Sequence, residues 1–299
     1  MIPTRLADYR AMIPWMDEVT TWSPLRKWAL SEVYRVKRIT GESRIIKWGG
    51  QEMAGESEIY LNFVHPLQIK APKIFEHFQF EDSGVIVMED AGTKDLEQQP
   101  EPAYFLEAAR ELARLRSKAT ANLERIAPRE IIAKHMVTSN DFLRFLDDLL
   151  NSPRLGDNTV LLNVKTVFSE HLEQLYQTVP ISLVHHDYHA KNLMMQDNGV
   201  MPIDWSNAYL SPHLGDLYCL MTEAQASTNL TREDILSAFL EGTDLTIDHL
   251  HWQMRIGGLC WLIKTLRWLV YDGIDIIPGS DAWIPDLLND VDHLYQEIG

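Results

Sequence analysis

The sequence predicts an α+β protein with two lobes, a small β-rich N-terminal lobe followed by a larger, mainly helical C-terminal lobe. Short runs of β-branched and aromatic residues crowd the first 90 residues, while apolar residues at helical spacing dominate the remainder. A single group of strand-like runs, near residues 181–205, interrupts the helical part. We therefore expect one lobe at 1–90, including a helical extension at its N-terminus, and the other at 91–299.

Four β-favouring runs define the small lobe. SEVYRVKRI (31–39) and SRIIKWG (43–49) flank a Thr-Gly turn and predict a hairpin. KIFEHFQF (73–80) and GVIVMED (84–90) flank an Asp-Ser-Gly turn in the same way. Between these pairs, residues 49–64 repeat apolar side chains at roughly helical spacing. The lobe is therefore expected to be an antiparallel sheet that carries one helix.

The larger lobe has the pattern of a series of helices. Residues 102–118 repeat apolar side chains at helical spacing, and Pro102 stands near the start, where a helix tolerates proline. Further helices are expected near 139–151, 158–177, 231–241, 247–271 and 283–297. In the strand-like exception, LVHH, NLMM and VMPID are expected to be short strands, with a hairpin turn at Asn198-Gly199.

The formal net charge of −16 argues against a nucleic-acid-binding protein, because affinity for phosphate backbones depends largely on Lys and Arg. The most apolar segment, IGGLCWLIKTLRWLV, is interrupted by Lys264 and Arg267, so we expect a core helix rather than a membrane span. Cys219 and Cys260 lie far apart in apolar surroundings and are expected to be buried thiols. We therefore expect a cytoplasmic protein without nucleic-acid or membrane partners, and leave its oligomeric state open.

The segment HHDYHAKN (185–192) concentrates polar chemistry. Its histidines suggest zinc, but adjacent residues on a strand point to opposite faces, so His185 and His186 would not reach one ion. A serine nucleophile is also disfavoured, because the chain has no G-x-S-x-G elbow. The pattern H-x-D-x-x-x-x-N, followed by an aspartate at the end of a hairpin strand, is instead typical of phosphoryl transfer.

Phosphoryl transfer explains why these residue types are needed. A carboxylate, here Asp187, would accept or orient the proton of the attacking hydroxyl. Mg²⁺ prefers oxygen ligands, which Asn192 and Asp204 would provide. The predicted hairpin brings Asp204 back beside Asn192.

HHDYHAKN, PIDW and HLGDLY together resemble the aminoglycoside phosphotransferase and choline kinase-like enzymes, which are relatives of the protein kinases. The resemblance extends from about residue 20 to the C-terminus and is specific over 185–216. It implies a bilobal protein kinase-like fold and the use of ATP and Mg²⁺. It also implies transfer of the γ-phosphate to a hydroxyl of a small molecule, such as an aminoglycoside, choline or another amino alcohol.

The same resemblance implies a role for each polar residue of these motifs. These are Asp187 as the catalytic base, Asn192 and Asp204 as metal ligands, and His185, His189 and Asp216 as supports of the catalytic loop. His186 stands where relatives usually have glycine.

In the small lobe, Lys47 falls at the end of the second predicted strand, where kinases place a lysine that contacts the α- and β-phosphates. The resemblance implies a glutamate partner on the following helix. We expect this partner to be Glu56, with Glu52 and Glu58 as competitors.

VIVMEDAG resembles the hinge that joins the two lobes of a kinase. Backbone groups of Glu89 and Ala91 would hold adenine there, and Met88 would line the pocket. The loop expected to cover the nucleotide lacks a G-x-G-x-x-G motif and offers only Ser31 and nearby backbone N–H groups. This departure leaves GTP open as an alternative phosphate donor.

The segment YDGIDIIPGSDAW brings three carboxylates together with two aromatic side chains, which would suit a cationic acceptor. These residues are Asp272, Asp275, Asp281, Tyr271 and Trp283. The alternative for this segment is a solvated acidic loop. For the whole protein, the alternative function is a catalytically silent nucleotide-binding pseudokinase or scaffold. A protein kinase is disfavoured, because the segment between Trp205 and HLGDLY is too short for a long activation loop.

Overall fold

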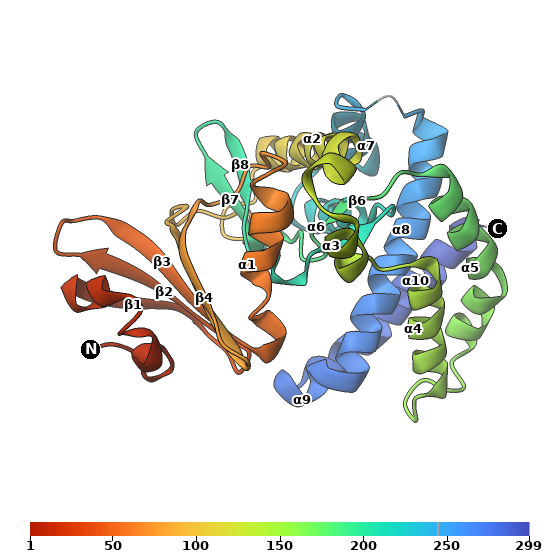
Figure 1. Ribbon diagram of the computed structural model, residues 1–299. Coiled ribbons are helices and arrows are strands. Elements are labelled where there is room, and N and C mark those ends of the chain that lie inside the picture. Colours follow the sequence, from red (N-terminus) through yellow and green to blue (C-terminus); the bar gives the residue numbers. More distant parts are fainter. Residues whose placement is uncertain (244, 299) are drawn as a thin grey trace.

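A five-stranded antiparallel sheet forms the N-terminal part of the protein, and helices form most of the C-terminal part (Figure 1). This computed structural model describes residues 1–243 and 245–298, apart from the side chain of Glu52. Helix α1 lies between the sheet and the helical part (Figure 1). The predicted α+β fold, with a β-rich part followed by a helical one, is confirmed.

The sheet has the strand order β1-β2-β3-β5-β4. Its strands are β1 (Val19–Lys27), β2 (Ser31–Arg38), β3 (Ser43–Gly50), β4 (Ile74–Gln79) and β5 (Ser83–Glu89). Both predicted hairpins are present, because β2 pairs with β3 and β4 pairs with β5. The sequence did not predict β1, which contains Pro24 and is irregular at two points of its pairing. An edge strand tolerates proline because its outer N–H groups need no partner within the sheet.

The two faces of the sheet have different coverings. On one face, Tyr34, Ile46 and Val87 pack against the expected N-terminal extension, which forms two 3₁₀-helices at Thr4–Tyr9 and Pro14–Glu18. Side chains alternate along a strand, so the neighbours of these residues point to the opposite face. That second face faces the cavity described below.

The helix predicted at 49–64 is split into shorter pieces. A 3₁₀ turn (Gln51–Met53) precedes α1 (Glu56–Ile59), which continues into a π-helical turn at Tyr60–Val64. Tyr60 and Phe63 are fully buried in a cluster with Trp205 of the C-terminal part. This packing connects the helix, and therefore Glu56, to the segment that carries Asp204.

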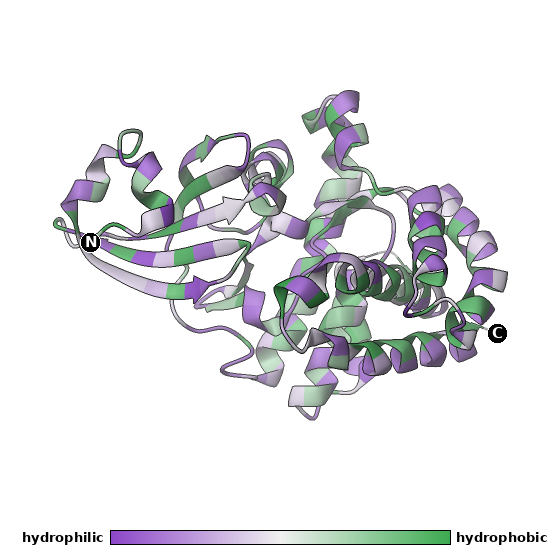
Figure 2. Ribbon diagram, turned by 90° about the horizontal axis from the view of Figure 1, so that it is seen from below, coloured by the Kyte–Doolittle hydropathy of each residue, from purple (hydrophilic) through white to green (hydrophobic). Residues whose placement is uncertain are grey.

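The helical part contains each of the predicted helices, within a few residues at their ends except for the first, which runs longer. Its helices are α2 (Pro102–Ile126), α3 (Arg129–His135), α4 (Ser139–Asn151), α5 (Thr159–Thr178), α6 (Gly215–Ser227), α7 (Arg232–Leu240), α8 (Ile247–Trp268), α9 (Ile274–Ile276) and α10 (Ile284–Ile298). Many of them have a hydrophobic and a hydrophilic side (Figure 2). In the described ranges, no helix combines the length and the apolar character that crossing a bilayer requires.

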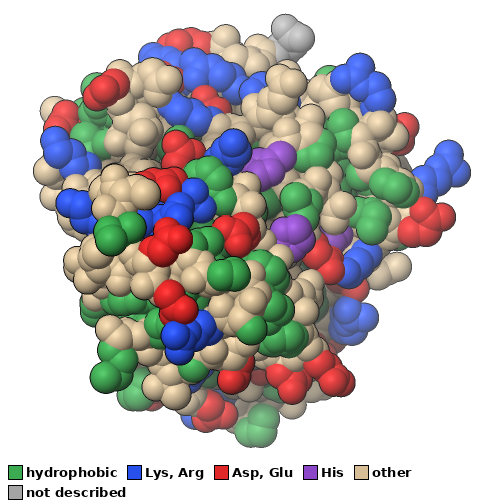
Figure 3. Space-filling view, turned by 60° about the vertical axis from the view of Figure 1, so that its left-hand side comes forward, with side chains coloured by type: hydrophobic (Ala, Val, Ile, Leu, Met, Phe, Trp, Pro, Cys, Tyr) green, Lys and Arg blue, Asp and Glu red, His purple; other side chains and the backbone are tan. Residues whose placement is uncertain are grey.

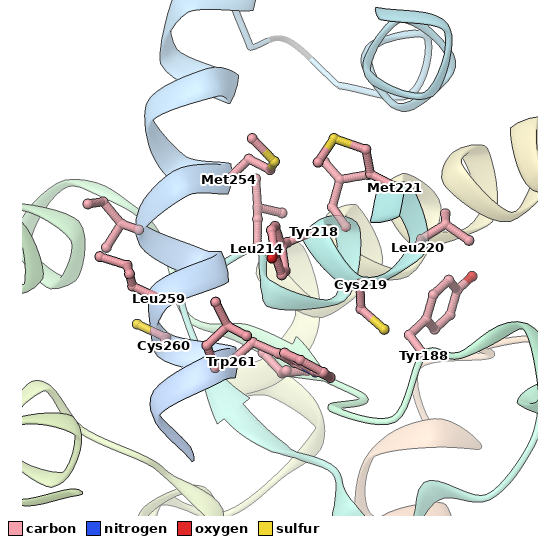
Figure 4. Packing of buried hydrophobic residues seen from close by; sticks show 14 of the residues in the cluster. Tyr188, Leu214, Tyr218, Cys219, Leu220, Met221, Met254, Leu259, Cys260 and Trp261 are labelled. Atoms are coloured by element: carbon pink, nitrogen blue, oxygen red, sulfur yellow. The ribbon is translucent and has the colours of Figure 1, made fainter. Parts of the chain in front are cut away.

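Helix α6 was not predicted, because it is buried on nearly every side and lacks a polar face at helical spacing. Tyr218, Cys219 and Leu220 of α6 lie in the same core as Trp261 of α8 (Figure 4). The start of α6 crosses α8 very closely. A Cβ added to Gly257 would lie 2.5 Å from the backbone nitrogen of Leu214, so this crossing requires glycine.

Two short antiparallel pairs frame the HHDYHAKN segment. Strand β6 (Ser182–Val184) pairs with β9 (Tyr209–Ser211), and β7 (Leu193–Gln196) pairs with β8 (Gly199–Pro202). The predicted hairpin turn is shifted by one residue, because Gln196 pairs with Gly199. Asp197 and Asn198 therefore form the two-residue loop, and Gly199 begins β8 with a φ of 117°.

Candidate active site

The loop between β6 and β7 is tied to α6 through Asp216. The backbone nitrogens of His185 and His186 donate hydrogen bonds to the two carboxylate oxygens of Asp216, at 2.7 and 2.8 Å. Burial raises the pKa of Asp216, although both backbone N–H groups act in the opposite direction. The His185 ring is also buried and its Nε2 lies 3.0 Å from the carbonyl oxygen of Ile203. The loop is thus fixed both to α6 and to the segment that leads into Asp204.

His186 has a backbone φ of 67°, in the left-handed region that favours glycine. Glycine would adopt this backbone conformation without steric strain. A non-glycine residue in this conformation costs about 1–2 kcal/mol. The His186 carbonyl oxygen accepts a hydrogen bond from Trp261 Nε1 at 2.9 Å, and the His186 ring packs near Tyr209. Burial, followed by the charge of Lys264, lowers the pKa of His186 well below its usual value.

Asp187 is held from both sides of its carboxylate. Asn192 Nδ2 donates to Asp187 Oδ2 and to the Asp187 carbonyl oxygen, at 2.9 Å each. His189 Nε2 and Lys191 Nζ lie 3.3 and 3.6 Å from Oδ1. The side chain remains 19% exposed, so these contacts orient it without enclosing it. The Asn192 amide nitrogen faces Asp187, and among the described residues no group donates a hydrogen bond to the Asn192 amide oxygen.

His189 connects Asp187 to α6. Its Nδ1 lies 2.6 Å from Glu223 Oε1, while Glu223 Oε2 accepts a hydrogen bond from the backbone nitrogen of Ala190 at 2.5 Å. Carboxylates only accept hydrogen bonds, so a His189 ring that bridges two of them donates from both nitrogens and is positively charged. Burial would lower the pKa of His189, but Cys219, Glu223 and Asp187 together raise it.

The histidines do not form the zinc site that their number suggested. His185 faces Ile203, the ring of His186 lies beside Tyr209, and His189 binds Glu223. In the described residues, one cluster has metal-ligand spacing, and it contains His189, Cys219 and Glu223. The hydrogen bonds within that cluster account for its compactness without a metal.

Lys47, Glu56 and Asp204 form a buried ion-pair group between the sheet and the loop. Lys47 Nζ lies 2.6 Å from Glu56 Oε2 and donates to Asp204 Oδ1 at 2.5 Å. Burial would lower the pKa of Lys47, but the charges of Asp204 and Glu56 outweigh it and raise the pKa. For Asp204, burial is likewise outweighed by Lys47, and its pKa is lowered. Burial dominates at Glu56 and raises its pKa despite Lys47.

One hydrogen bond ties this group to the residue that follows Asp204, and the backbone of Asp204 itself has an unusual conformation. Glu56 Oε1 accepts a hydrogen bond from the backbone nitrogen of Trp205 at 3.1 Å, and Asp204 has a left-handed φ of 65°. Of the two competitors for the role of Glu56, Glu58 forms an ion pair with Lys134 instead. The side chain of Glu52 lies outside the described part of the structure.

A cavity of about 480 Å³ runs between the sheet and the loop, and the predicted residues meet on its walls. Lys47, Glu56, Met88, Glu89, Ala91, Asn192 and Asp204 all line it. Ser31 is not brought there. It is buried in β2, and its carbonyl oxygen accepts a hydrogen bond from the Trp28 nitrogen. Among the described residues, the backbone N–H of Ala91 has no hydrogen-bond partner, whereas its carbonyl accepts from Gln196 Nε2 at 2.7 Å.

Several residues of the site were missed. Apolar side chains of Val33, Ile45 and Ile203 line the cavity, and so does Arg26 of β1. Nothing in the local sequence marked Arg26. Glu223 lies seven residues after Asp216, a spacing that places both carboxylates on one face of a helix. That signal would have found Glu223 if α6 had been recognised.

The residues considered either for a cationic acceptor or as a solvated acidic loop lie outside this cavity. Asp272, Asp275 and Asp281 are exposed, Tyr271 and Trp283 are about half-exposed, and none of the five lines the cavity. Helix α9, which contains Asp275, lies at the far end of α8 (Figure 1). The sheet side of the molecule carries interspersed acidic and basic side chains, with histidines near its centre (Figure 3).

Fold and site together define a phosphotransferase. The model of the phosphotransferase enzyme family matches residues 51–249, two thirds of the chain, and the chain belongs to this family. The predicted enzyme class is thereby confirmed. No curated protein matches the chain by sequence.

Solved structures share the whole fold. Choline kinase LicA from Streptococcus pneumoniae superposes with a TM-score of 0.69 at 17% identity, covering 97% of this chain and 98% of its own. A thermostable mutant of aminoglycoside phosphotransferase APH(4)-Ia, in a ternary complex with ADP and hygromycin B, gives 0.64 at 15% identity, covering 97% and 98%. Spectinomycin phosphotransferase APH(9)-Ia, with ADP and spectinomycin, gives 0.60 at 13% identity, covering 94% and 93%.

Proposed function

We propose that the protein is a kinase that uses ATP and Mg²⁺ to phosphorylate a hydroxyl group of a small molecule. The observation that carries this proposal is the meeting of Lys47, Glu56, Asn192 and Asp204 around one cavity, with Asp187 hydrogen-bonded to Asn192. These residues come from distant parts of the sequence, and each has the chemistry that one step of phosphoryl transfer needs.

The cavity suits a nucleotide. Its volume lies within the range of about 300–1,000 Å³ that small-molecule sites occupy. Val33, Ile45 and Ile203 supply apolar walls for a base, and the free N–H of Ala91 is a donor that adenine would satisfy. Lys47, held by two carboxylates, offers its charge to phosphates at the deeper end. The structural relatives in complex with ADP support this assignment.

The oxygen atoms of Asn192 and Asp204 fit Mg²⁺. The Asn192 amide nitrogen is committed to Asp187, which leaves the amide oxygen as a ligand, and Asp204 stays ionised beside Lys47. Hard divalent cations prefer such oxygen donors. When bound, Mg²⁺ would neutralise charge on the phosphates.

We assign the role of catalytic base to Asp187. Its carboxylate would accept the proton of the acceptor hydroxyl as that oxygen forms a bond to the γ-phosphorus and the bond to the leaving ADP breaks. Asn192 and His189 hold its two oxygens, so the carboxylate is oriented before the acceptor arrives. Asp216 and His185 contribute by fixing the loop, rather than by touching the reacting atoms.

An amino-bearing alcohol or sugar is our preferred acceptor. The structural relatives include a choline kinase and enzymes in complex with hygromycin B and spectinomycin. The exposed Asp272, Asp275 and Asp281 are not needed for this preference. Both cysteines are buried free thiols, which suits the reducing cytoplasm where we expect the enzyme to act.

The test is ATP consumption measured over a panel of amino alcohols, sugars and aminoglycosides. We expect turnover with at least one class, and a fall of about 10²–10⁴-fold in Asp187→Asn, with ADP binding retained. Unchanged turnover in Asp187→Asn would remove this residue as the base. Nucleotide binding without turnover across the panel would favour the silent pseudokinase or scaffold.

A further inference from the structure

Arg26 reaches from the edge strand β1 to the metal-ligand aspartate. Its Nη1 lies 3.4 Å from Asp204 Oδ2, although 178 residues separate the two in sequence. The guanidinium also stacks on Trp28, with its central carbon 3.8 Å from the ring centroid. Arg26 lines the same cavity as Lys47.

The two oxygens of Asp204 have different partners. Oδ1 accepts from Lys47 at 2.5 Å and from Ser206 Oγ at 2.8 Å. Among the described residues, Oδ2 has Arg26 as its one hydrogen-bond donor. Oδ2 is therefore the oxygen left for a metal, and a cation bound at about 2.0–2.1 Å would be repelled by the guanidinium beside it.

Charge is balanced at this end of the cavity when Arg26 is in place. Lys47 and Arg26 face Glu56 and Asp204, two cations against two carboxylates. Without Arg26, one carboxylate charge is uncompensated. Because uncompensated charge in a partly buried site is costly, the vacated site attracts another cation.

The loop between β1 and β2, which would cover a nucleotide, has a fixed backbone, so we expect the Arg26 side chain rather than this backbone to contact the phosphates. The loop between β1 and β2 contains Trp28 and Ala29 rather than a glycine-rich motif. Arg5, from the N-terminal extension, donates to the Ala29 carbonyl at 3.0 Å and stacks over Trp48. The loop backbone is thus tied to the extension, while the Arg26 side chain lines the cavity and is 32% exposed.

We propose that Arg26 occupies two positions: it caps Asp204 Oδ2 in the nucleotide-free protein, and it turns onto the nucleotide phosphates when they enter. The inference rests on the proposed function. A guanidinium binds phosphate oxygens in a bidentate manner, and stacking on Trp28 keeps it near the cavity during the exchange. Asp204 Oδ2 is then exposed for the metal when phosphate is present, so the metal enters with the nucleotide rather than alone.

The test compares metal and nucleotide binding in Arg26→Gln and in the full-length wild type. Mn²⁺, which shares the oxygen preference of Mg²⁺, is titrated into nucleotide-free protein by calorimetry, and ADP is titrated separately in the presence of EDTA. We expect Arg26→Gln to bind Mn²⁺ about tenfold more tightly and ADP about tenfold more weakly. Arg26→Lys, which keeps the charge but loses the fork, should lie between the two.

Lys27→Gln is the matched control, because Lys27 is the next residue and is exposed. It should leave both affinities unchanged. An Arg26→Gln protein that binds Mn²⁺ no more tightly than the wild type, or ADP equally well, overturns the proposal. A wild type that binds ADP but phosphorylates nothing counts against the proposed function alone, since both titrations are independent of turnover.

Discussion

At the sheet end of the site, Lys47 is buried between two carboxylates, whereas at the loop end Asp187 stays partly exposed, next to the cavity-lining Asn192 that holds it by a hydrogen bond. The first arrangement depends on charges that compensate one another away from water, so the loss of one partner leaves the others costly. The second depends on a polar network that reaches α6 through His189 and Glu223. Mutations should therefore affect stability at the sheet end and turnover at the loop end.

The largest expected effect on stability is at Lys47. Lys47→Met leaves Glu56 buried without its cation and Asp204 with Arg26 alone, and should lower the free energy of unfolding by about 3–5 kcal/mol. Urea denaturation measures this loss. Lys37→Met, on the exposed side of β2, is the control and should have no effect. Asp187→Asn should change the free energy of unfolding by less than about 1 kcal/mol. Equal losses of stability in Lys47→Met and Asp187→Asn would contradict the difference between the two ends of the site.

Glu223→Gln tests the loop end. It weakens the hold on His189 and on the Ala190 backbone, so we expect kcat to fall by up to about 10²-fold while the KM for ATP is unchanged. Steady-state kinetics with the best acceptor of the panel measures both. Glu170→Gln, an exposed change on α5, serves as the control. A rise in the KM for ATP in Glu223→Gln would instead show that a change at the loop end also affects nucleotide binding at the sheet end.

His186 allows a comparison between backbone strain and packing. Both His186→Gly and His186→Ala remove the ring that packs near Tyr209, but only glycine relieves the left-handed backbone. We therefore expect the glycine variant to be more stable than the alanine variant by about 1–2 kcal/mol. Chemical unfolding of the two proteins measures the difference. Equal stabilities would mean that the loop relaxes when the ring is removed.

The smallest expected effect is a pH dependence from His213. Its Nδ1 accepts from the Gly215 nitrogen at 3.0 Å, and burial, followed by Arg116 and Lys264, lowers its pKa well below the usual value. In the unfolded chain the ring takes up a proton near pH 6.5, which the folded protein resists. Stability should therefore fall as pH drops below this value, by up to about 1.4 kcal/mol per pH unit.

His213→Asn is the comparison for that slope. Denaturation between pH 5 and 8 should show a shallower pH dependence in the variant than in the wild type. A slope that is unchanged in His213→Asn would assign the pH dependence to other groups, such as His185 and His186, whose pKa values are also lowered by burial.

Sequence reasoning located the loop end of the site because its residues are close together in the chain. Asp187 and Asn192 lie five positions apart, and a single hairpin brings Asp204 to them. Lys47 was found because it falls near the end of the second predicted strand, where kinases place a lysine that contacts phosphates. These are local regularities, which the sequence displays directly.

Contacts over long distances in the chain were not predictable in this way. Arg26 meets Asp204 only after the sheet is placed over the loop, and Ser31 is buried beside the turn from β1 instead of lining the cavity. Helix α6 was missed because burial on all sides removes the alternation that marks a helix. The composition of the acidic segment near α9 left both a cationic-acceptor site and a solvated acidic loop open, and the fold leaves its carboxylates exposed and outside the cavity.

The close crossing at Gly257 has a consequence for variation in this chain. A methyl group there would press on the backbone of Leu214 and displace α8, which also carries Trp261 and its hydrogen bond to the His186 carbonyl. Substitution at this glycine, which packs against Leu214 and Gly215 just before Asp216, would thus reach the loop as a change of helix position. A side chain larger than hydrogen at this position would therefore act on the site for reasons of space alone.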